Sequence, residues 1–353
     1  MGMWKRPSRL FRKRSVADAG TGQRQASKRT PLPPPGSLRD ATELNTIMKT
    51  SETELRIDLH CHSSASNGAT GRPADIARVL KEAGISAFAL AEHDCLSSQE
   101  AAARGAELAG IEFMTAVEVS TRVGDSSLQD RPYAHVLGYG FRRSPELEAM
   151  IARAYDARAE ALRSRLERCR AEGLIDFGEE ELRKLIEEEW GGDDLWKQPF
   201  GCPMPAGLLL QQKGLGRPGE SPSATADRVL GQEYPPTDSH LWPDVRETCD
   251  TLHNAGGVAI LAHPVDIDRK KILRWLGGRV DGVEIYHPKN GPEYRAMLLD
   301  VVAEAGCAFT GGSDLHWYGM DDLEDHLSDA PYACIDSLKA ALQEMSCKGR
   351  THV

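Results

Sequence analysis

The sequence lacks the features that define several large classes of protein. It contains no run of eighteen apolar residues, so no transmembrane helix is expected. Its eight cysteines in 353 residues are too sparse for a disulfide scaffold, and no CxxC pair indicates a zinc ribbon or a redox motif. Basic residues are also in deficit, with 43 Lys and Arg against 53 Asp and Glu, which argues against a broad nucleic-acid surface. We therefore expect a cytoplasmic globular protein with no membrane segment and no stable nucleic-acid complex.

The charge is unevenly distributed along the chain. Residues 1–34 hold nine Lys or Arg and a single acid, Asp18, so this segment carries +8 and the rest of the chain −18. The segment lacks apolar periodicity and runs into a proline-rich stretch at 31–35, which is typical of a disordered chain. We expect residues 1–50 to form a disordered basic tail, with a targeting segment or an RNA contact as alternatives and no secretory signal. The folded domain should occupy residues 51–353.

Strand-like and helix-like segments alternate through the rest of the chain. Apolar runs predict strands at Leu55–Leu59, Ser86–Ala91, Ile111–Val119, Tyr133–Tyr139, Gly257–Ala262, Val280–Tyr286 and Ala308–Gly311. Helical patterns predict Pro73–Ala83, a helix capped by Ser97 that reaches Leu108, Trp242–Asn254, Asp268–Leu276 and Pro292–Ala305. This alternation is typical of an α/β fold with a parallel sheet, open or closed into a barrel. In such folds the functional residues gather at the carboxyl ends of the strands.

A long insertion interrupts the alternation at roughly residues 146–240. Its first part, Leu147–Cys169, repeats apolar residues at helical spacing among Arg and Glu, and Glu179–Trp190 has the pattern of a short acidic helix. The remainder is rich in Gly and Pro and is expected to form loops. We predict a mainly helical subdomain placed over one end of the sheet.

Candidate metal ligands stand where the predicted strands end. His60 and His62 are two residues apart, so both project from one face of the first strand and can chelate one ion. Asp314 and His316 repeat this spacing after the last strand. A single histidine after a strand is usually a core or loop residue, but here six histidines and two carboxylates share one end of six strands, which favours a metal centre. The set is His60, His62, His93, Glu118, His135, His263, Asp314 and His316.

The ligand types narrow the metal and the chemistry. Imidazole with carboxylate and no thiolate suits Zn²⁺, Mn²⁺ or Fe²⁺ better than Ca²⁺ or Mg²⁺. Eight ligands exceed the needs of one ion, so we expect two or three divalent metals, with Glu118 or Asp314 able to bridge them. Such clusters activate a hydroxide and hold the attacked and leaving oxygens in line. The expected reaction is hydrolysis, most naturally of a phosphoester.

The same motifs, taken in order, resemble the PHP (polymerase and histidinol phosphatase) domain. The resemblance covers about residues 55–345 and is strongest to the single-domain phosphoesterase branch, which includes nucleotide phosphatases and RNA exonucleases. It implies a distorted (β/α)7 TIM-like barrel with a trinuclear site. The motifs that carry it are Asp58-Leu59-His60-Cys61-His62-Ser63, Ala91-Glu92-His93-Asp94, Val117-Glu118-Val119-Ser120, His135-Val136-Leu137-Gly138-Tyr139, Ala262-His263-Pro264 and Gly312-Ser313-Asp314-Leu315-His316.

The resemblance also implies which residues hold each ion. Three ligand sets follow from it: His60, His62, Glu118 and Asp314 for the first ion, Glu118, His135 and His263 for the second, and His93 and His316 for the third. The family's further ligand of the third ion is an Asp, and the residue at that position here is Asn67. Because Asn offers only a neutral oxygen, we predict that the third site is the weakest.

Other departures from the family pattern concern the supporting residues and the substrate. Glu92 stands where Asp is usual, at a position that supports a ligating histidine. The family's Gly-Arg-Pro-His stretch contacts the substrate phosphate, and its nearest counterpart here is Gly201-Cys202-Pro203-Met204. This puts the usual nucleotide preference in question, and Arg217 and Arg228 are candidates for the missing contact.

For five residues within or near the motifs, the sequence does not favour a role in the site over a structural role. Asp58 either orients a ligand or bonds to a loop. For His287 and Lys289 a solvated loop is favoured over a contact with substrate. Cys61 and Cys95 are expected to pack as small apolar residues.

Three functions compete. The leading hypothesis is a metal-dependent phosphoesterase acting on a small phosphorylated substrate, with a nucleotide or a short RNA end among the candidates. Glu118 and Asp314 would organise the metals, and His263 or a metal-bound water would protonate the leaving oxygen. An amidohydrolase-type enzyme acting on C–N bonds shares the HxH motif, but the DxH motif and Glu118 as the bridge count against it. A PHP-like protein that binds metal or nucleotide with weakened catalysis is favoured only by Asn67, Cys202 and Met204.

Overall fold

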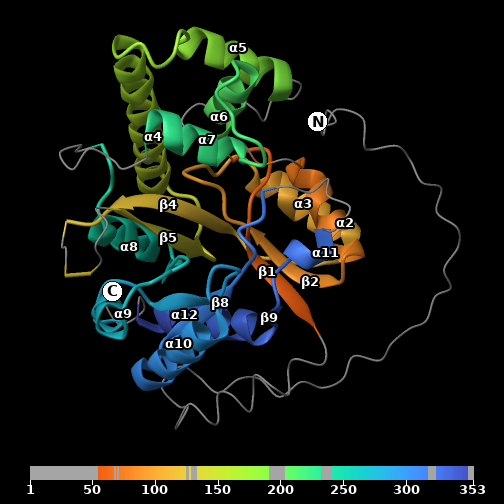
Figure 1. Ribbon diagram of the computed structural model, residues 1–353. Helices are drawn as coiled ribbons and strands as arrows, with labels where there is room; N and C mark the ends of the chain where they lie inside the picture. Colours follow the sequence, from red (N-terminus) through yellow and green to blue (C-terminus); the bar gives the residue numbers. More distant parts are fainter. Residues whose placement is uncertain are drawn as a thin grey trace, which may run out of the picture.

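The computed structural model describes residues 55–66, 69, 71–124, 127–128, 133–190, 203–231, 241–316 and 323–348. In these ranges the chain forms two sheets with helices on their outer faces, and a helical insertion stands over one end (Figure 1). The basic tail predicted for residues 1–50 lies outside the described residues. The strands are β1 Arg56–Cys61, β2 Ile85–Leu90, β3 Glu112–Phe113, β4 Ala116–Arg122, β5 Tyr133–Tyr139, β6 Val258–Leu261, β7 Gly282–Tyr286, β8 Ala308–Gly311 and β9 Ala330–Pro331.

One strand, β5, runs antiparallel to its neighbours where a parallel sheet was predicted. The first sheet has the order β3-β2-β1-β9 and the second β4-β5-β6-β7-β8. Neighbouring strands are parallel except that β9 runs against β1 and β5 runs against both β4 and β6, so the prediction of a parallel sheet is wrong there. A parallel pair needs a crossover connection, and no helix separates β4 from β5 in the described residues. Because β5 is reversed, its first residues lie beside the end of β4, and His135 pairs with Ser120.

The predicted strand Ile111–Val119 is divided between the two sheets. Its first part is β3, at the edge of the first sheet, and its second part is β4, at the edge of the other. Two isolated bridges join the sheets: His93, after β2, pairs with Glu118 inside β4, and Cys61, at the end of β1, pairs with Leu315, after β8. The carboxyl ends of β1, β2 and β8 therefore meet beside β4, and the α/β class is confirmed.

Helices with one apolar face cover the outer sides of both sheets. Buried residues of α2 and α3 pack on the first sheet, and those of α8, α9, α10 and α12 pack on the second. The side chains of Asp244 and Asp268 accept hydrogen bonds from the first turns of α8 and α9 and fix where these helices begin. Ser97 does not cap α3 as predicted, because α3 begins at Gln99 and its N-cap residue is Ser98; the Ser97 hydroxyl lies 3.1 Å from Cys95 Sγ. The helices are α2 Pro73–Glu82, α3 Gln99–Ala109, α8 Val245–Asn254, α9 Arg269–Leu276, α10 Pro292–Ala305, α11 Leu323–His326 and α12 Ala333–Lys348.

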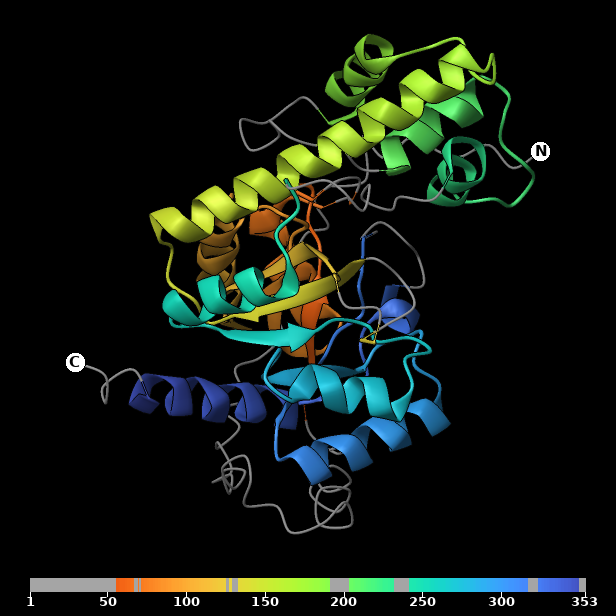
Figure 2. The same ribbon diagram turned by 90° about the vertical axis from the view of Figure 1, so that its left-hand side faces the viewer.

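The described part of the insertion consists of four helices and short loops. Helix α4, Pro145–Ala171, crosses over the sheets in Figure 2: its first half packs on the main core and its second half forms a separate core with α5, α6 and α7. Helix α5, Glu179–Trp190, was predicted, whereas α6, Pro203–Gln212, and α7, Pro222–Leu230, replace predicted loops. Gly207 permits that packing, because a Cβ there would collide with the carbonyl oxygen of Pro222. No helix in the described ranges is both long and apolar enough to cross a membrane.

Candidate metal centre

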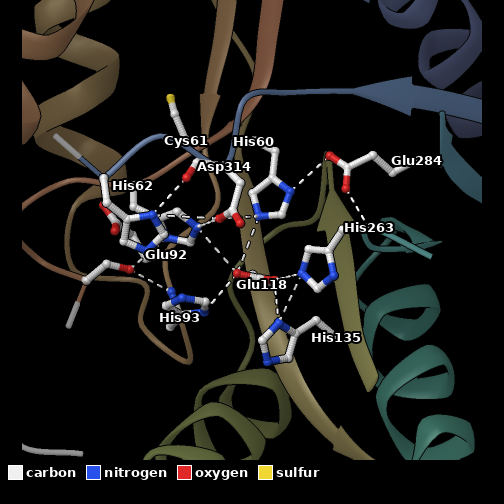
Figure 3. A network of polar contacts seen from close by, with 12 residues as sticks. His60, Cys61, His62, Glu92, His93, Glu118, His135, His263, Glu284 and Asp314 are labelled. Carbon is white, nitrogen blue, oxygen red and sulfur yellow. Dashed lines mark hydrogen bonds and ion pairs between the residues drawn. The ribbon is translucent and has the colours of Figure 1, made fainter. Parts of the chain in front are cut away.

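A single carboxylate, Glu118 of β4, lies at the centre of the strand-end cluster. Its side chain is fully buried and points toward five imidazoles that come from β1, β5 and the ends of β2 and β6 (Figure 3). Glu118 Oε1 lies 2.6 Å from His135 Nδ1 and 2.9 Å from His263 Nε2. Glu118 Oε2 lies 2.7, 3.3 and 3.4 Å from nitrogens of His93, His60 and His62. Burial raises the pKa of Glu118, but the charges of His135, His93 and His60 outweigh burial and hold that pKa well below its usual range.

A second carboxylate, Asp314, closes the other side of the cluster. It follows β8, and its Oδ1 lies 3.2 Å from His62 Nε2 and 3.7 Å from His60 Nε2. Its backbone has φ 56, a conformation uncommon for a residue other than glycine. His316 Nδ1 donates to the carbonyl oxygen of Asp314 (2.8 Å), and the His316 ring stacks on His62 with centroids 4.2 Å apart. All eight strand-end residues of the predicted set are thus brought together.

The potential ligand atoms fall into three overlapping groups, each with its atoms within 4.8 Å of one another. His60, His62, Glu118 and Asp314 form a group identical to the set expected for the first ion. The other two groups are His93 with Glu118 and His135, and His62 with His93 and His316. In the first of these, His93 stands where the expected set has His263. The second contains the expected His93 and His316 together with His62. Asn67 lies outside the described residues.

These residues fit divalent cations by an observation independent of the motifs. Three of the buried polar atoms that face the cluster, His60 Nε2, His93 Nδ1 and Glu118 Oε2, have no partner in hydrogen-bonding geometry among the described residues, although some of them approach one another closely. Leaving such an atom unsatisfied costs about 1–3 kcal/mol. Two imidazole nitrogens, His135 Nδ1 and His263 Nε2, also face each other at 3.2 Å. Cations between these atoms would satisfy all of them, and imidazole with carboxylate is a donor set that suits Zn²⁺, Mn²⁺ or Fe²⁺.

Glu284 of β7 supports two of the candidate ligands and was missed in the sequence. It is fully buried, and it accepts a hydrogen bond from His60 Nδ1 (2.9 Å) and another from the backbone N–H of His263 (2.7 Å). Burial raises the pKa of Glu284, but the nearby His60 charge holds it below its usual value. The sequence does contain a signal for Glu284, because it is an acidic residue inside the otherwise apolar strand Gly282–Tyr286.

Glu284 is expected to control metal affinity. The isosteric change Glu284→Gln replaces the charged acceptor of His60 Nδ1 with a neutral one, so we expect metal affinity to fall by about 10–100-fold. Equilibrium dialysis with metal analysis measures this. Glu293→Gln, at an exposed position of α10, is the matched control and should bind metal as the native chain does. Unchanged metal affinity in Glu284→Gln would show that Glu284 is only a structural residue.

His287 was wrongly expected to lie in a solvated loop. It is 1% exposed, with its Nε2 3.6 Å from Asp314 Oδ2 and its ring centroid 5.4 Å from that of His263. Its Nδ1 accepts the backbone N–H of Lys289 (3.2 Å). Lys289 itself is exposed, yet its Nζ also reaches to 3.6 Å from Asp314 Oδ2. Both residues therefore bring hydrogen-bond donors to the rim of the centre beside Asp314.

Two buried acids of the motifs, Glu92 and Asp58, are hydrogen-bonded to serines that lie beside the candidate ligands. Glu92 accepts hydrogen bonds from the backbone N–H and the hydroxyl of Ser63, and its link to His62 passes through Ser66, whose Oγ lies 3.0 Å from His62 Nδ1. Asp58 accepts from the N–H (2.9 Å) and hydroxyl (2.6 Å) of Ser313, and burial raises the pKa of Asp58 to about 6. Asp58 also accepts the backbone N–H of the candidate ligand His60 (3.4 Å), so both of its interpretations stay open.

The remaining candidates lie away from the centre or outside the described residues. Arg228 is paired with Glu220 within the insertion (2.8 Å), and Arg217 is exposed in the loop before Glu220. Met204 is buried in α6, whereas Cys202 is not among the described residues. Cys61 packs in the core as predicted.

A cavity of about 370 Å³ opens beside His93. One wall is the loop after β2, with Cys95 and Leu96, and the other is α4, with Ile151, Ala152 and Tyr155. The cavity therefore joins the candidate metal centre to the insertion.

Comparisons with known proteins agree with this geometry. Residues 58–178 match the PHP domain, so the predicted resemblance is confirmed. A 5'-3' exoribonuclease of Haemophilus influenzae is 26% identical over 270 residues, which is 74% of this chain and 90% of that protein. A 3',5'-nucleoside bisphosphate phosphatase of Chromobacterium violaceum is 26% identical over 294 residues, 79% of this chain and 93% of that protein.

Solved structures share the fold. A putative metal-dependent phosphoesterase from Bifidobacterium adolescentis superposes with a TM-score of 0.63 at 20% identity, covering 80% of this chain and 95% of that one. A Chromobacterium violaceum structure described as an amidohydrolase, with bound sulfate and no metal, gives 0.62 at 24% identity, covering 82% and 96%.

Proposed function

We propose that this chain is a metal-dependent phosphoesterase that hydrolyses a small phosphorylated substrate, either a nucleotide or the end of a short RNA. The observation that carries the proposal is a buried carboxylate, Glu118, within 3.4 Å of five imidazoles. The relatives named for phosphatase and exoribonuclease activity cover three quarters of the chain and support the same reaction class.

Two or three divalent ions, Mn²⁺, Zn²⁺ or Fe²⁺, would occupy the centre. His60, His62, Glu118 and Asp314 would hold the first, and Glu118 would bridge to a second at His135 and His263. His93, His316 and Asn67 would hold the third, the weakest. Ions bound there would attract a phosphate group and make water a better nucleophile.

The protein's own groups prepare this centre for metal and substrate. The Nδ1–H of His60 donates a hydrogen bond to Glu284 and that of His316 donates to the Asp314 carbonyl, which leaves the Nε2 lone pairs of both rings for metal. His263 stands at the rim with 23% of its side chain exposed, whereas Glu118 is fully buried. If the second ion were held by Glu118 and His135 without His263, this position would suit His263 to protonate the leaving oxygen, with Glu118 and Asp314 organising the metals, because an imidazole bound to an ion cannot also supply that proton.

We also propose that the two sheets are halves of a distorted seven-stranded, TIM-like barrel built from β1, β2 and β4 to β8. The isolated bridges connect β1 and the residues after β2, from the middle of the first sheet, with the residues after β8 and with β4, at the two edges of the second sheet, and support this closure. The chain would then consist of a tail at 1–50 and a cytoplasmic PHP-like domain at 51–353 that carries the insertion 146–240.

The cavity beside His93 is proposed to receive the organic part of the substrate. Changing Ala152 to Trp would fill the cavity from α4, so the KM for a nucleotide should rise by about tenfold while the rate with glycerol phosphate stays unchanged. Ser164→Trp, at an exposed position of the same helix, is the control. Steady-state kinetics that show equal losses on both substrates, or none, would place the organic group elsewhere.

The amidohydrolase alternative is less well supported. Among the described residues Glu118 pairs with histidines and with no lysine, whereas that class often uses a modified lysine as the bridge. The test is an assay of the metal-loaded protein on mononucleotides, nucleoside bisphosphates, short RNA, glycerol phosphate and amides. Turnover of phosphoesters is expected. Turnover of amides alone would favour the alternative, and no turnover with the metals bound would favour the catalytically weakened protein.

A further inference from the structure

A buried ion pair connects the insertion to the metal centre. Arg158 of α4 is 4% exposed, and it donates from Nε (3.0 Å) and Nη2 (2.8 Å) to Asp94 Oδ2. Asp94 directly follows the candidate ligand His93. The ion pair therefore joins the helix that begins the insertion to the loop that presents that ligand.

Asp94 has a strained conformation that ties this loop to β4. Its backbone has φ 48, in the left-handed region that residues other than glycine seldom adopt. Its carboxylate accepts the backbone N–H and the hydroxyl of Ser120, both at 2.8 Å, and its own N–H donates to the carbonyl of Glu118 (2.9 Å). The backbone after His93 is thus fixed to β4 at Glu118 and at Ser120.

We infer that Arg158 is a positioning residue of the metal centre, which holds His93 against Glu118 through Asp94. This inference rests on the proposed metal-dependent function. His93 Nδ1 lies 2.7 Å from Glu118 Oε2, and this spacing depends on the register between the loop and β4. Without Arg158 the carboxylate of Asp94 would be buried with Ser120 alone, and the loop would relax toward solvent to rehydrate that charge.

A buried ion pair is weak evidence of a gain in stability, because replacing it by apolar groups is often neutral. We therefore attribute the Arg158–Asp94 pair to the geometry of the loop that it holds. The same stretch of α4 also supplies Ile151 and Tyr155 to the cavity wall. One helix therefore sets both the position of His93 and the shape of the cavity beside it.

The insertion offers a matched control for this role. Arg165 lies two turns further along α4, is also buried, and donates from Nη1 to the carbonyl of Gly231 (3.0 Å) within the insertion. Arg158→Met and Arg165→Met each remove one buried guanidinium from the same helix. Arg158→Lys keeps the charge and provides a milder variant in case Arg158→Met does not fold.

The experiment measures Mn²⁺ binding to the full chain by equilibrium dialysis, together with thermal unfolding of the metal-free proteins. We expect Arg158→Met to lose one equivalent of Mn²⁺, or to bind it about tenfold more weakly, and Arg158→Lys to fall between it and the native chain. Arg165→Met should keep the native isotherm even where its stability drops. Native Mn²⁺ binding by Arg158→Met, or by Arg158→Lys where the former does not fold, would overturn the inference. Because binding is measured without substrate, a native chain that binds metal but hydrolyses no phosphoester would refute only the proposed function.

Discussion

Glu118→Gln is expected to abolish the proposed phosphoesterase activity, with a loss of about 10³-fold or more in kcat/KM. The change keeps the shape of the side chain but removes its negative charge, and five imidazoles face that charge within 3.4 Å. A neutral amide cannot compensate the ions that would share this carboxylate. Both the number of bound metals and the activity should therefore fall together in metal analysis and steady-state kinetics.

The control for this variant is Glu112→Gln, the same substitution on β3. Glu112 pairs with Lys339 at 2.7 Å, away from the centre, so its loss should leave metal content and kcat/KM unchanged. A Glu118→Gln protein that binds metal and turns over substrate as the native chain does would show that Glu118 does not lie between the ions.

Removal of the metals should destabilise the fold as well as stop the reaction. Ligands that bind only the folded state at about a thousand times their Kd stabilise it by about 4 kcal/mol, so chelation should lower Tm by roughly 5–10 °C. The physical reason is that chelation leaves buried atoms such as His60 Nε2 and Glu118 Oε2 without partners. Calorimetry with and without chelator measures the shift, and addition of Mn²⁺ should restore both Tm and activity. A Tm unaffected by chelator would contradict the binding of metal ions at this centre.

Spacing within a strand made much of the centre predictable. His60 and His62 had to share a face because side chains in a strand alternate with a period of two, and the pair does converge on Glu118. The strand-end histidines could be found because each follows or begins an apolar run.

Features that depend on contacts between distant segments could not be predicted in this way. The reversal of β5 depends on the connection after β4, and local periodicity carries no information on strand direction. Glu284 and His287 join the centre from β7 through contacts with His60 and Asp314, residues far from them in the chain. Helices α6 and α7 are stabilised by packing on each other and on α4. Because their Gly- and Pro-rich sequence has little helical propensity of its own, the sequence predicted loops there.

The most direct test of the central claim is a titration of metal-stripped protein with Mn²⁺, in which bound metal and hydrolysis of a nucleotide are measured on the same samples. We predict that activity is absent without metal and rises as two to three ions bind per chain. Hydrolysis that persists in the stripped protein, or a fully loaded protein that hydrolyses no phosphoester, would contradict the assignment of this cluster as the centre of a metal-dependent phosphoesterase.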